Sequence, residues 1–113
     1  MTLSELKKHY DFEFIRDNES PFFTGGESLE TFFLFFCDQR NIEQDVIPVL
    51  QHYLAGNPFP IDNDLTVGGG DIVEVTPTEV TFTNRVTFLI EQSLPLQDFL
   101  DISKEWANFL AMK

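Results

Sequence analysis

Few residues of the types that most often perform chemistry occur in this chain. It has two histidines, His9 and His52, and a single cysteine, Cys37. A zinc site needs several His or Cys ligands at short spacings, and a general base needs a positioned partner; the sequence shows neither pattern. The apolar neighbours of Cys37 predict a buried thiol that is not activated as a nucleophile. One cysteine forms no internal disulfide, which suits a reducing cytoplasm.

Two short motifs resemble ligand-binding loops but lack the residues that would complete them. Gly68-Gly69-Gly70 could wrap a phosphate, yet a phosphate-binding loop continues with Lys and then Ser or Thr, whereas Asp71 follows here. Asp62-Asn63-Asp64 resembles the start of a calcium loop. Val67 stands where that loop requires glycine, and Val73 where it requires Glu. The sequence therefore predicts no metal site and no cofactor.

Charge is the strongest signal in the composition. Nineteen Asp and Glu residues outnumber seven Lys and Arg residues, which gives a net charge of -12. Such a chain repels nucleic acid, because phosphate binding needs cations to displace counterions, and it is equally unsuited to anionic membranes. It favours a basic protein partner.

The negative charge is concentrated in the middle of the chain. No Lys or Arg lies between Arg40 and Arg85, and seven carboxylates do: Glu43, Asp45, Asp62, Asp64, Asp71, Glu74 and Glu79. Complementary charge raises the association rate and selects the partner, so this stretch predicts a protein-binding surface. The alternative is a solvated acidic face that keeps the chain soluble. We expect partner contacts from the four that fall on a predicted loop and hairpin: Asp62, Asp64, Asp71 and Glu74.

The elements that must position these carboxylates can be read from the periodicity. The 113 residues, 42% hydrophobic and 14% aromatic, suit a single domain over 1–113 with one core. Thr2 and Glu5 form a capping box before a helix over 3–9, and alternation at Tyr10, Phe12 and Phe14 predicts a strand. Residues 18–26 are expected to be a loop. Two helices follow, over 29–39 with Ser28 as the cap, and over 41–56 with Pro48 in the first regular turn.

A β pattern replaces the helical one in the second half. Strands are predicted over 72–75, 80–83 and 86–90, and an amphipathic helix over 95–112 that buries Phe99, Trp106 and Leu110. The sum is an α+β fold. We expect an antiparallel sheet of three to four strands packed with three to four helices.

Two stretches resemble a known family. The last helix reads Pro95-Leu96-x-x-Phe99-Leu100-x-Ile102-x-x-x-Trp106-x-x-Phe109-Leu110, and an early segment reads Glu19-Ser20-Pro21-Phe22-Phe23, then Gly25-Gly26-Glu27-Ser28-Leu29. In these the chain resembles bacterial immunity proteins, the antitoxins of polymorphic and contact-dependent growth inhibition toxins. The resemblance implies a cytoplasmic protein that binds a toxin domain and blocks its active site. Many such toxins are nucleases and therefore basic.

The leading hypothesis is accordingly a non-enzymatic immunity protein, monomeric or a small homo-oligomer, which binds a basic cognate toxin domain and neither nucleic acid nor membrane. The second is an acidic nucleic-acid mimic or adaptor that binds a basic protein of the host. The third is a small enzyme with an unrecognised site. Carboxylate pairs are numerous, but no combination of nucleophile, base and oxyanion donor stands out.

Overall fold

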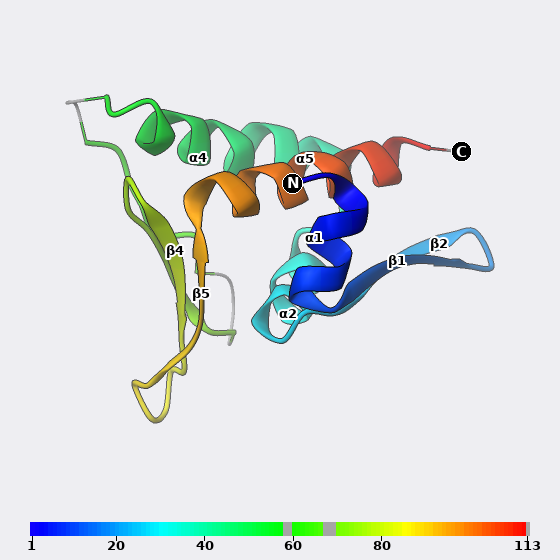
Figure 1. Cartoon of the computed structure of the whole chain (residues 1–113), viewed down its shortest axis with the longest axis horizontal. Helices are drawn as coiled ribbons and strands as arrows, with labels where there is room; N and C mark the ends of the chain where they lie inside the picture. The colour runs from blue at the N-terminus through cyan, green and yellow to red at the C-terminus, as the bar shows by residue number, and fades with distance from the viewer. Residues whose placement is uncertain (58–59, 67–69, 113) are drawn as a thin grey trace.

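The computed structural model describes residues 1–57, 60–66 and 70–112, and these form an α+β fold. The expected class is confirmed, but the strands divide between two antiparallel sheets. Strands β1 (Phe12–Asp17) and β2 (Ser20–Gly25) form a hairpin. Strands β3 (Ile72–Val75), β4 (Glu79–Thr83) and β5 (Ile90–Pro95) form a three-stranded sheet. Helices lie between the sheets and along one side of both (Figure 1).

Helix α5 (Leu96–Ala111) is the element on which the others pack. It contacts α1 (Leu3–Tyr10), the helical segments that follow α2, and strands of both sheets. Its predicted apolar face is confirmed, with Phe99 and Trp106 fully buried and Leu110 partly so. In the part of the chain that the structure describes, no helix combines the length and apolar character that crossing a membrane requires.

The first hairpin departs from the sequence prediction. The capping box at Thr2 and Glu5 is present, but α1 continues through Tyr10, so β1 begins only at Phe12. Residues 18–26 are not a loop, because most of them form β2. The tight turn needs only Asn18 and Glu19, which both have positive φ as a two-residue hairpin turn demands. Pro21 is tolerated because a two-stranded sheet has only edge strands.

Helix α2 (Ser28–Phe35) is shorter than predicted, which changes the environment of the cysteine. Ser28 lies inside the helix rather than capping it, and the helix ends four residues before Gln39. Phe36 then leaves the helical region, with φ -94° and ψ 70°, and its side chain turns into the core. The predicted burial of Cys37 is wrong: it is exposed in the link to α3 (Gln39–Asn41).

Pro48 explains an unusual turn in the next helical stretch. A π-helical segment, η1 (Ile42–Val46), precedes α4 (Ile47–Leu54), and the Ile47 N–H bonds to the Ile42 carbonyl five residues back. A proline ring clashes with the carbonyl four residues before it and offers no N–H. The wider π turn relieves this clash, and the predicted place of Pro48 in the first regular turn is confirmed.

In the second sheet, β3 and β4 are as predicted, but the predicted strand over 86–90 is wrong. Residues 84–89 form the loop between β4 and β5, and β5 begins at Ile90. The Asn84 side chain accepts the N–H groups of Val86 and Thr87 at 2.8 and 2.9 Å, which closes a turn there. This local bonding overrides the strand propensity of the β-branched and aromatic residues.

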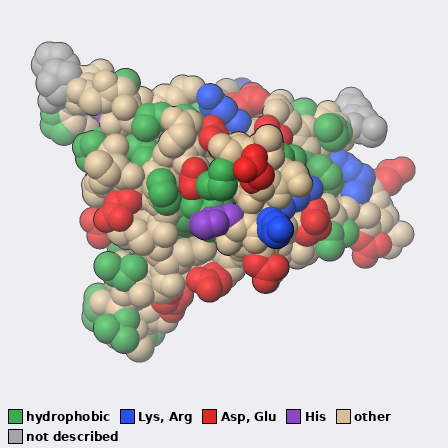
Figure 2. Space-filling model, in the orientation of Figure 1, with side chains coloured by type: hydrophobic (Ala, Val, Ile, Leu, Met, Phe, Trp, Pro, Cys, Tyr) green, Lys and Arg blue, Asp and Glu red, His purple; other side chains and the backbone are tan. Residues whose placement is uncertain are grey.

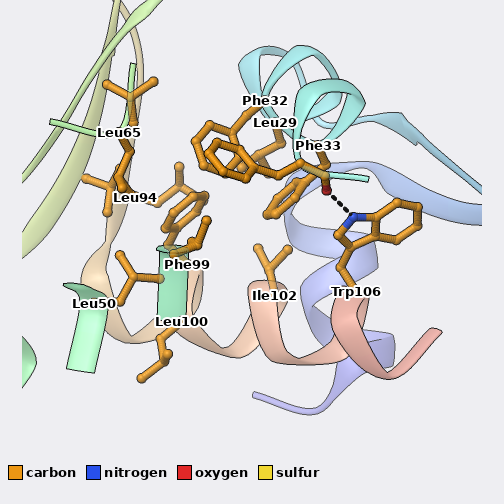
Figure 3. Close-up of a cluster of buried hydrophobic side chains, with 14 of the residues drawn as sticks. Leu29, Phe32, Phe33, Leu50, Leu65, Leu94, Phe99, Leu100, Ile102 and Trp106 are labelled. Atoms are coloured by element: carbon orange, nitrogen blue, oxygen red, sulfur yellow. Dashed lines mark hydrogen bonds between the residues drawn. The ribbon is translucent and has the colours of Figure 1, made fainter. Parts of the chain in front are cut away.

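The core is a continuous network of aromatic rings. Phe82 of the three-stranded sheet contacts Phe32 and Phe99, and Phe33 links Phe99 to Phe23 of the first hairpin. Ring centroids along this path are 4.7 to 6.0 Å apart. The indole of Trp106 lies at the hairpin end of the network, and its Nε1–H donates to the Phe36 carbonyl at 2.8 Å (Figure 3). One core therefore serves both sheets.

Trp106 gives the first test of this packing. Trp106→Ala should lower the free energy of unfolding by about 3–5 kcal/mol, because it removes a fully buried indole. Trp106→Phe keeps most of the ring but leaves the Phe36 carbonyl unpaired, and should cost about 1–3 kcal/mol. Denaturant unfolding measures both. A loss below about 1 kcal/mol for Trp106→Ala would show that the indole does not hold the core.

Two glycines with positive φ make a matched pair for a second test. Gly25 has φ +78°, and a Cβ there would lie 2.4 Å from the Asp11 carbonyl oxygen. Gly56, just after α4, has φ +69° with nothing within 4 Å. Gly56→Ala should therefore cost only the left-handed backbone strain, about 1–2 kcal/mol. Gly25→Ala should cost clearly more, and equal losses in denaturant unfolding would contradict the close approach.

Candidate functional site

Three carboxylates from two separate parts of the chain line one open groove of about 480 Å³. Asp45 comes from η1, and Asp62 and Asp64 come from the segment over 60–66. Gln44, Thr66 and three apolar side chains complete the lining: Phe36, Val49 and Leu65. We call this the acidic groove. Asp45 lies within the π-helical segment η1, and such segments are frequent at functional sites.

The segment over 60–66 is held in place by strand-like pairing beside β3. The N–H of Leu65 donates to the Val73 carbonyl, and the N–H of Val75 donates to the Asn63 carbonyl, both at 2.9 Å. Asn63 also donates its side-chain amide to the Val75 carbonyl at 3.0 Å. The Leu65 side chain is buried in the core. The groove wall is therefore part of the folded domain rather than a loose loop.

Local hydrogen bonds fix the orientation of two groove carboxylates. Asp62 accepts the N–H of Asp64 at 3.0 Å, and Asp64 accepts the N–H of Thr66 at 2.8 Å. The hydrogen bond from Thr66 lowers the pKa of Asp64, because it stabilises the charged form. No Lys or Arg is among the described lining residues.

Asp71 lies elsewhere, in a second concavity of about 470 Å³. Glu27 and Glu91 line it with Asp71, together with Ser28 and Thr31. We call this the acidic pocket. Burial raises the pKa of the half-buried Asp71, and the charge of Glu91 raises it further. No pattern in the sequence places Glu27 and Glu91 together: Glu27 precedes α2, and Glu91 lies in β5, most of which was not predicted as a strand.

Glu74 lies next to the acidic groove, directly opposite Asp64 in an antiparallel bridge. Its side chain is exposed, on the face of the three-stranded sheet opposite to the buried Val73 and Val75. The structure thus places Asp62 and Asp64 in one groove, with Glu74 opposite Asp64 on the neighbouring strand, and sets Asp71 apart. It adds Asp45 to the first pair.

Basic side chains neutralise little of this surface. Among the described residues, Lys7 and Glu13 form the one salt bridge made by a Lys or Arg, at 2.6 Å. Arg16 and Arg85 donate instead to the backbone carbonyls of Phe109 and Gly70. Figure 2 shows carboxylates spread across the face of the molecule that it presents. No group of three His, Cys, Asp or Glu side chains in the described ranges is arranged to hold a metal ion.

No family model, curated protein or solved structure matches this chain. The geometry and charge of its surface therefore carry the functional argument. The acidic groove brings carboxylates and apolar side chains together in one concavity. Residues 68 and 69 of the glycine run, and Val67 of the calcium-like motif, lie outside the described residues.

The raised pKa of Asp71 predicts a pH-dependent stability. Below about pH 4, the ordinary pKa of Asp, the carboxyl is protonated in folded and unfolded chains alike, and its contribution to stability is fully present. That contribution is lost as pH rises through the raised pKa of the folded state. Asp71→Asn should therefore become more stable relative to the unsubstituted chain as pH rises from 4 to 7.

Denaturant unfolding at several pH values measures this difference, with Glu74→Gln as a control for the loss of one exposed carboxylate. A difference between Asp71→Asn and the unsubstituted chain that stays constant over this range would contradict the environment described for Asp71.

Proposed function

We propose that this chain is an inhibitory binding protein of the immunity-protein kind, which occupies the nucleic-acid site of a basic toxin domain. The acidic groove carries the proposal: three carboxylates share its lining with apolar side chains, and no basic residue is among the described lining. It is the part of the predicted acidic surface in which the fold gathers charge and apolar area at one place. The protein acts by binding rather than by catalysis.

The proposed inhibition is a competition between anions. A nuclease holds its substrate with Lys and Arg aimed at phosphates, and the groove carboxylates present negative oxygens to the same groups. Asp62 and Asp64 are already oriented by backbone N–H groups, so little side-chain freedom is lost on binding. The half-buried Val49 adds apolar contact in the same groove, whose lining also includes the buried Phe36 and Leu65. Charge would then govern the association rate and apolar contact the lifetime of the complex.

The exposed thiol supports the compartment that goes with this proposal. Cys37 is free and exposed, and such a thiol persists in reducing surroundings. It therefore supports a cytoplasmic site of action, where an immunity protein would meet a toxin that has entered the cell.

The test begins with the product of the gene immediately upstream of the one that encodes this chain. Its toxin domain is co-expressed with the chain, the complex is purified, and nuclease activity is measured as the chain is titrated in. We expect a stable complex and loss of activity at equimolar ratio. Absence of a complex, or a complex that retains full activity, would overturn the proposal. Capture of basic host proteins in preference to the toxin domain would favour the adaptor hypothesis.

The groove itself is tested with two charge-matched double variants. Asp62→Asn with Asp64→Asn keeps both backbone-accepting oxygens but removes two charges from the groove. Asp17→Asn with Glu19→Gln removes two exposed charges at the turn of the first hairpin. We expect the groove variant alone to slow association with the toxin domain, by about tenfold at 0.1 M salt, and to flatten its salt dependence. Equal effects of the two variants would show that only the overall charge matters.

A further inference from the structure

The loop between β4 and β5 presents a cluster of apolar side chains to solvent. Val86, Phe88, Leu89 and Ile90 are between 65% and 85% exposed, and we call these four residues the hairpin tip. They project at the far end of the three-stranded sheet, away from the helices (Figure 1), and green side chains gather there in the space-filling view (Figure 2). An exposed apolar cluster of this kind marks an interaction site.

The hairpin tip is built as a fixed structure. The Asn84 backbone joins the start of the loop to its end, donating to the Leu89 carbonyl at 2.9 Å and accepting the Phe88 N–H at 2.8 Å. Its side chain also donates to Glu91 at 2.6 Å. Phe88 has φ +58°, a left-handed conformation that is strained for a bulky residue. The surrounding bonds hold the Phe88 ring out in water at a cost to stability, which is typical of functional positions.

Carboxylates lie beside the hairpin tip. Glu91 follows Ile90 directly and lines the acidic pocket with Glu27 and Asp71. The Arg85 guanidinium, at the start of the loop, is turned to the Gly70 carbonyl at 3.1 Å. The hairpin thus has an apolar tip with the carboxylates of the acidic pocket beside it.

We infer that the hairpin tip inserts into an apolar pocket that basic residues border on the partner protein, with Phe88 as the anchor. This inference rests on the proposed function and adds a second contact to the acidic groove. The partner's basic rim would face Glu91, Glu27 and Asp71 while the tip is buried. Rigid aromatic anchors lose little conformational freedom on binding, so the strained Phe88 is already prepared for its pocket.

The negative charge of the acidic pocket favours a basic protein over two other possible partners of the hairpin tip, an anionic membrane and a second copy of the chain. An anionic membrane would meet the carboxylates of the acidic pocket with like charge. A second copy of the chain would bring the same carboxylates and a further net charge of -12. A basic protein is the occupant that complements both parts of the surface.

The experiment measures association and dissociation rates with the toxin domain used above. Phe88→Asn removes the anchor and places at φ +58° a residue that tolerates this conformation. We expect dissociation about 30-fold faster, an unchanged association rate and salt slope, and a melting temperature equal to or above that of the unsubstituted chain. Leu89→Ser should act in the same direction. Phe22→Thr, which removes an exposed phenylalanine from the first hairpin, should leave dissociation unchanged.

The outcomes separate this inference from the proposed function. If the unsubstituted chain binds the toxin domain but Phe88→Asn dissociates within twofold of it, the hairpin tip is not the anchor, and the proposed function stands. If the unsubstituted chain does not bind, the proposed function fails and takes with it the partner assigned to the tip. Binding to neutral phosphatidylcholine vesicles, or self-association in sedimentation, that Phe88→Asn abolishes would also overturn the assignment.

Discussion

The hydrogen bond from the Trp106 indole to the Phe36 carbonyl is the interaction on which the rest of the structure depends. It joins the last helix to the point where α2 ends, and it is buried. A carbonyl released by a helix end in the core needs a donor, and the indole supplies it. The chain can therefore leave α2 at Phe36 and begin α3 and η1. Phe36 also lines the acidic groove, so the same bond positions part of the candidate site.

The aromatic network explains how so small a chain supports two sheets. Thirteen phenylalanines and one tryptophan supply large apolar side chains with few rotatable bonds. Phe33 lies at the centre, in contact with rings of α2, α5 and the first hairpin. A sheet of two or three strands needs an apolar face packed against other elements to be stable. Both sheets of this chain obtain that packing from the shared core. Exposed apolar side chains remain outside it, among them the hairpin tip, the pair Ile15 and Phe22 of the first hairpin, and the pair Leu34 and Phe35 of α2.

Elements with strong local signals could be predicted from the sequence. The capping box at Thr2, the placement of Pro48 and the apolar stripe of α5 each depend on contacts within a few residues, and each is present. The errors occurred where side chains bond locally to the backbone or where long-range packing decides. Asn84 converted a predicted strand into a loop, and the Trp106 bond ended α2 early enough to expose Cys37. Of the acidic groove, Asp62 and Asp64 were predicted as contact residues, but nothing in the sequence indicates that Asp45 lies beside them.

Exposure of Cys37 has a consequence for observing this protein in solution. The chain has one cysteine and one tryptophan. The Cys37 thiol is exposed, whereas the Trp106 indole is fully buried and donates a hydrogen bond to Phe36, the residue before Cys37. A quencher or acceptor dye attached to the thiol would sit near the single tryptophan, whose emission can be excited selectively over that of the two tyrosines. The pair would thus report optically on the junction between α2 and α5, and on any rearrangement of the adjoining groove when a partner arrives.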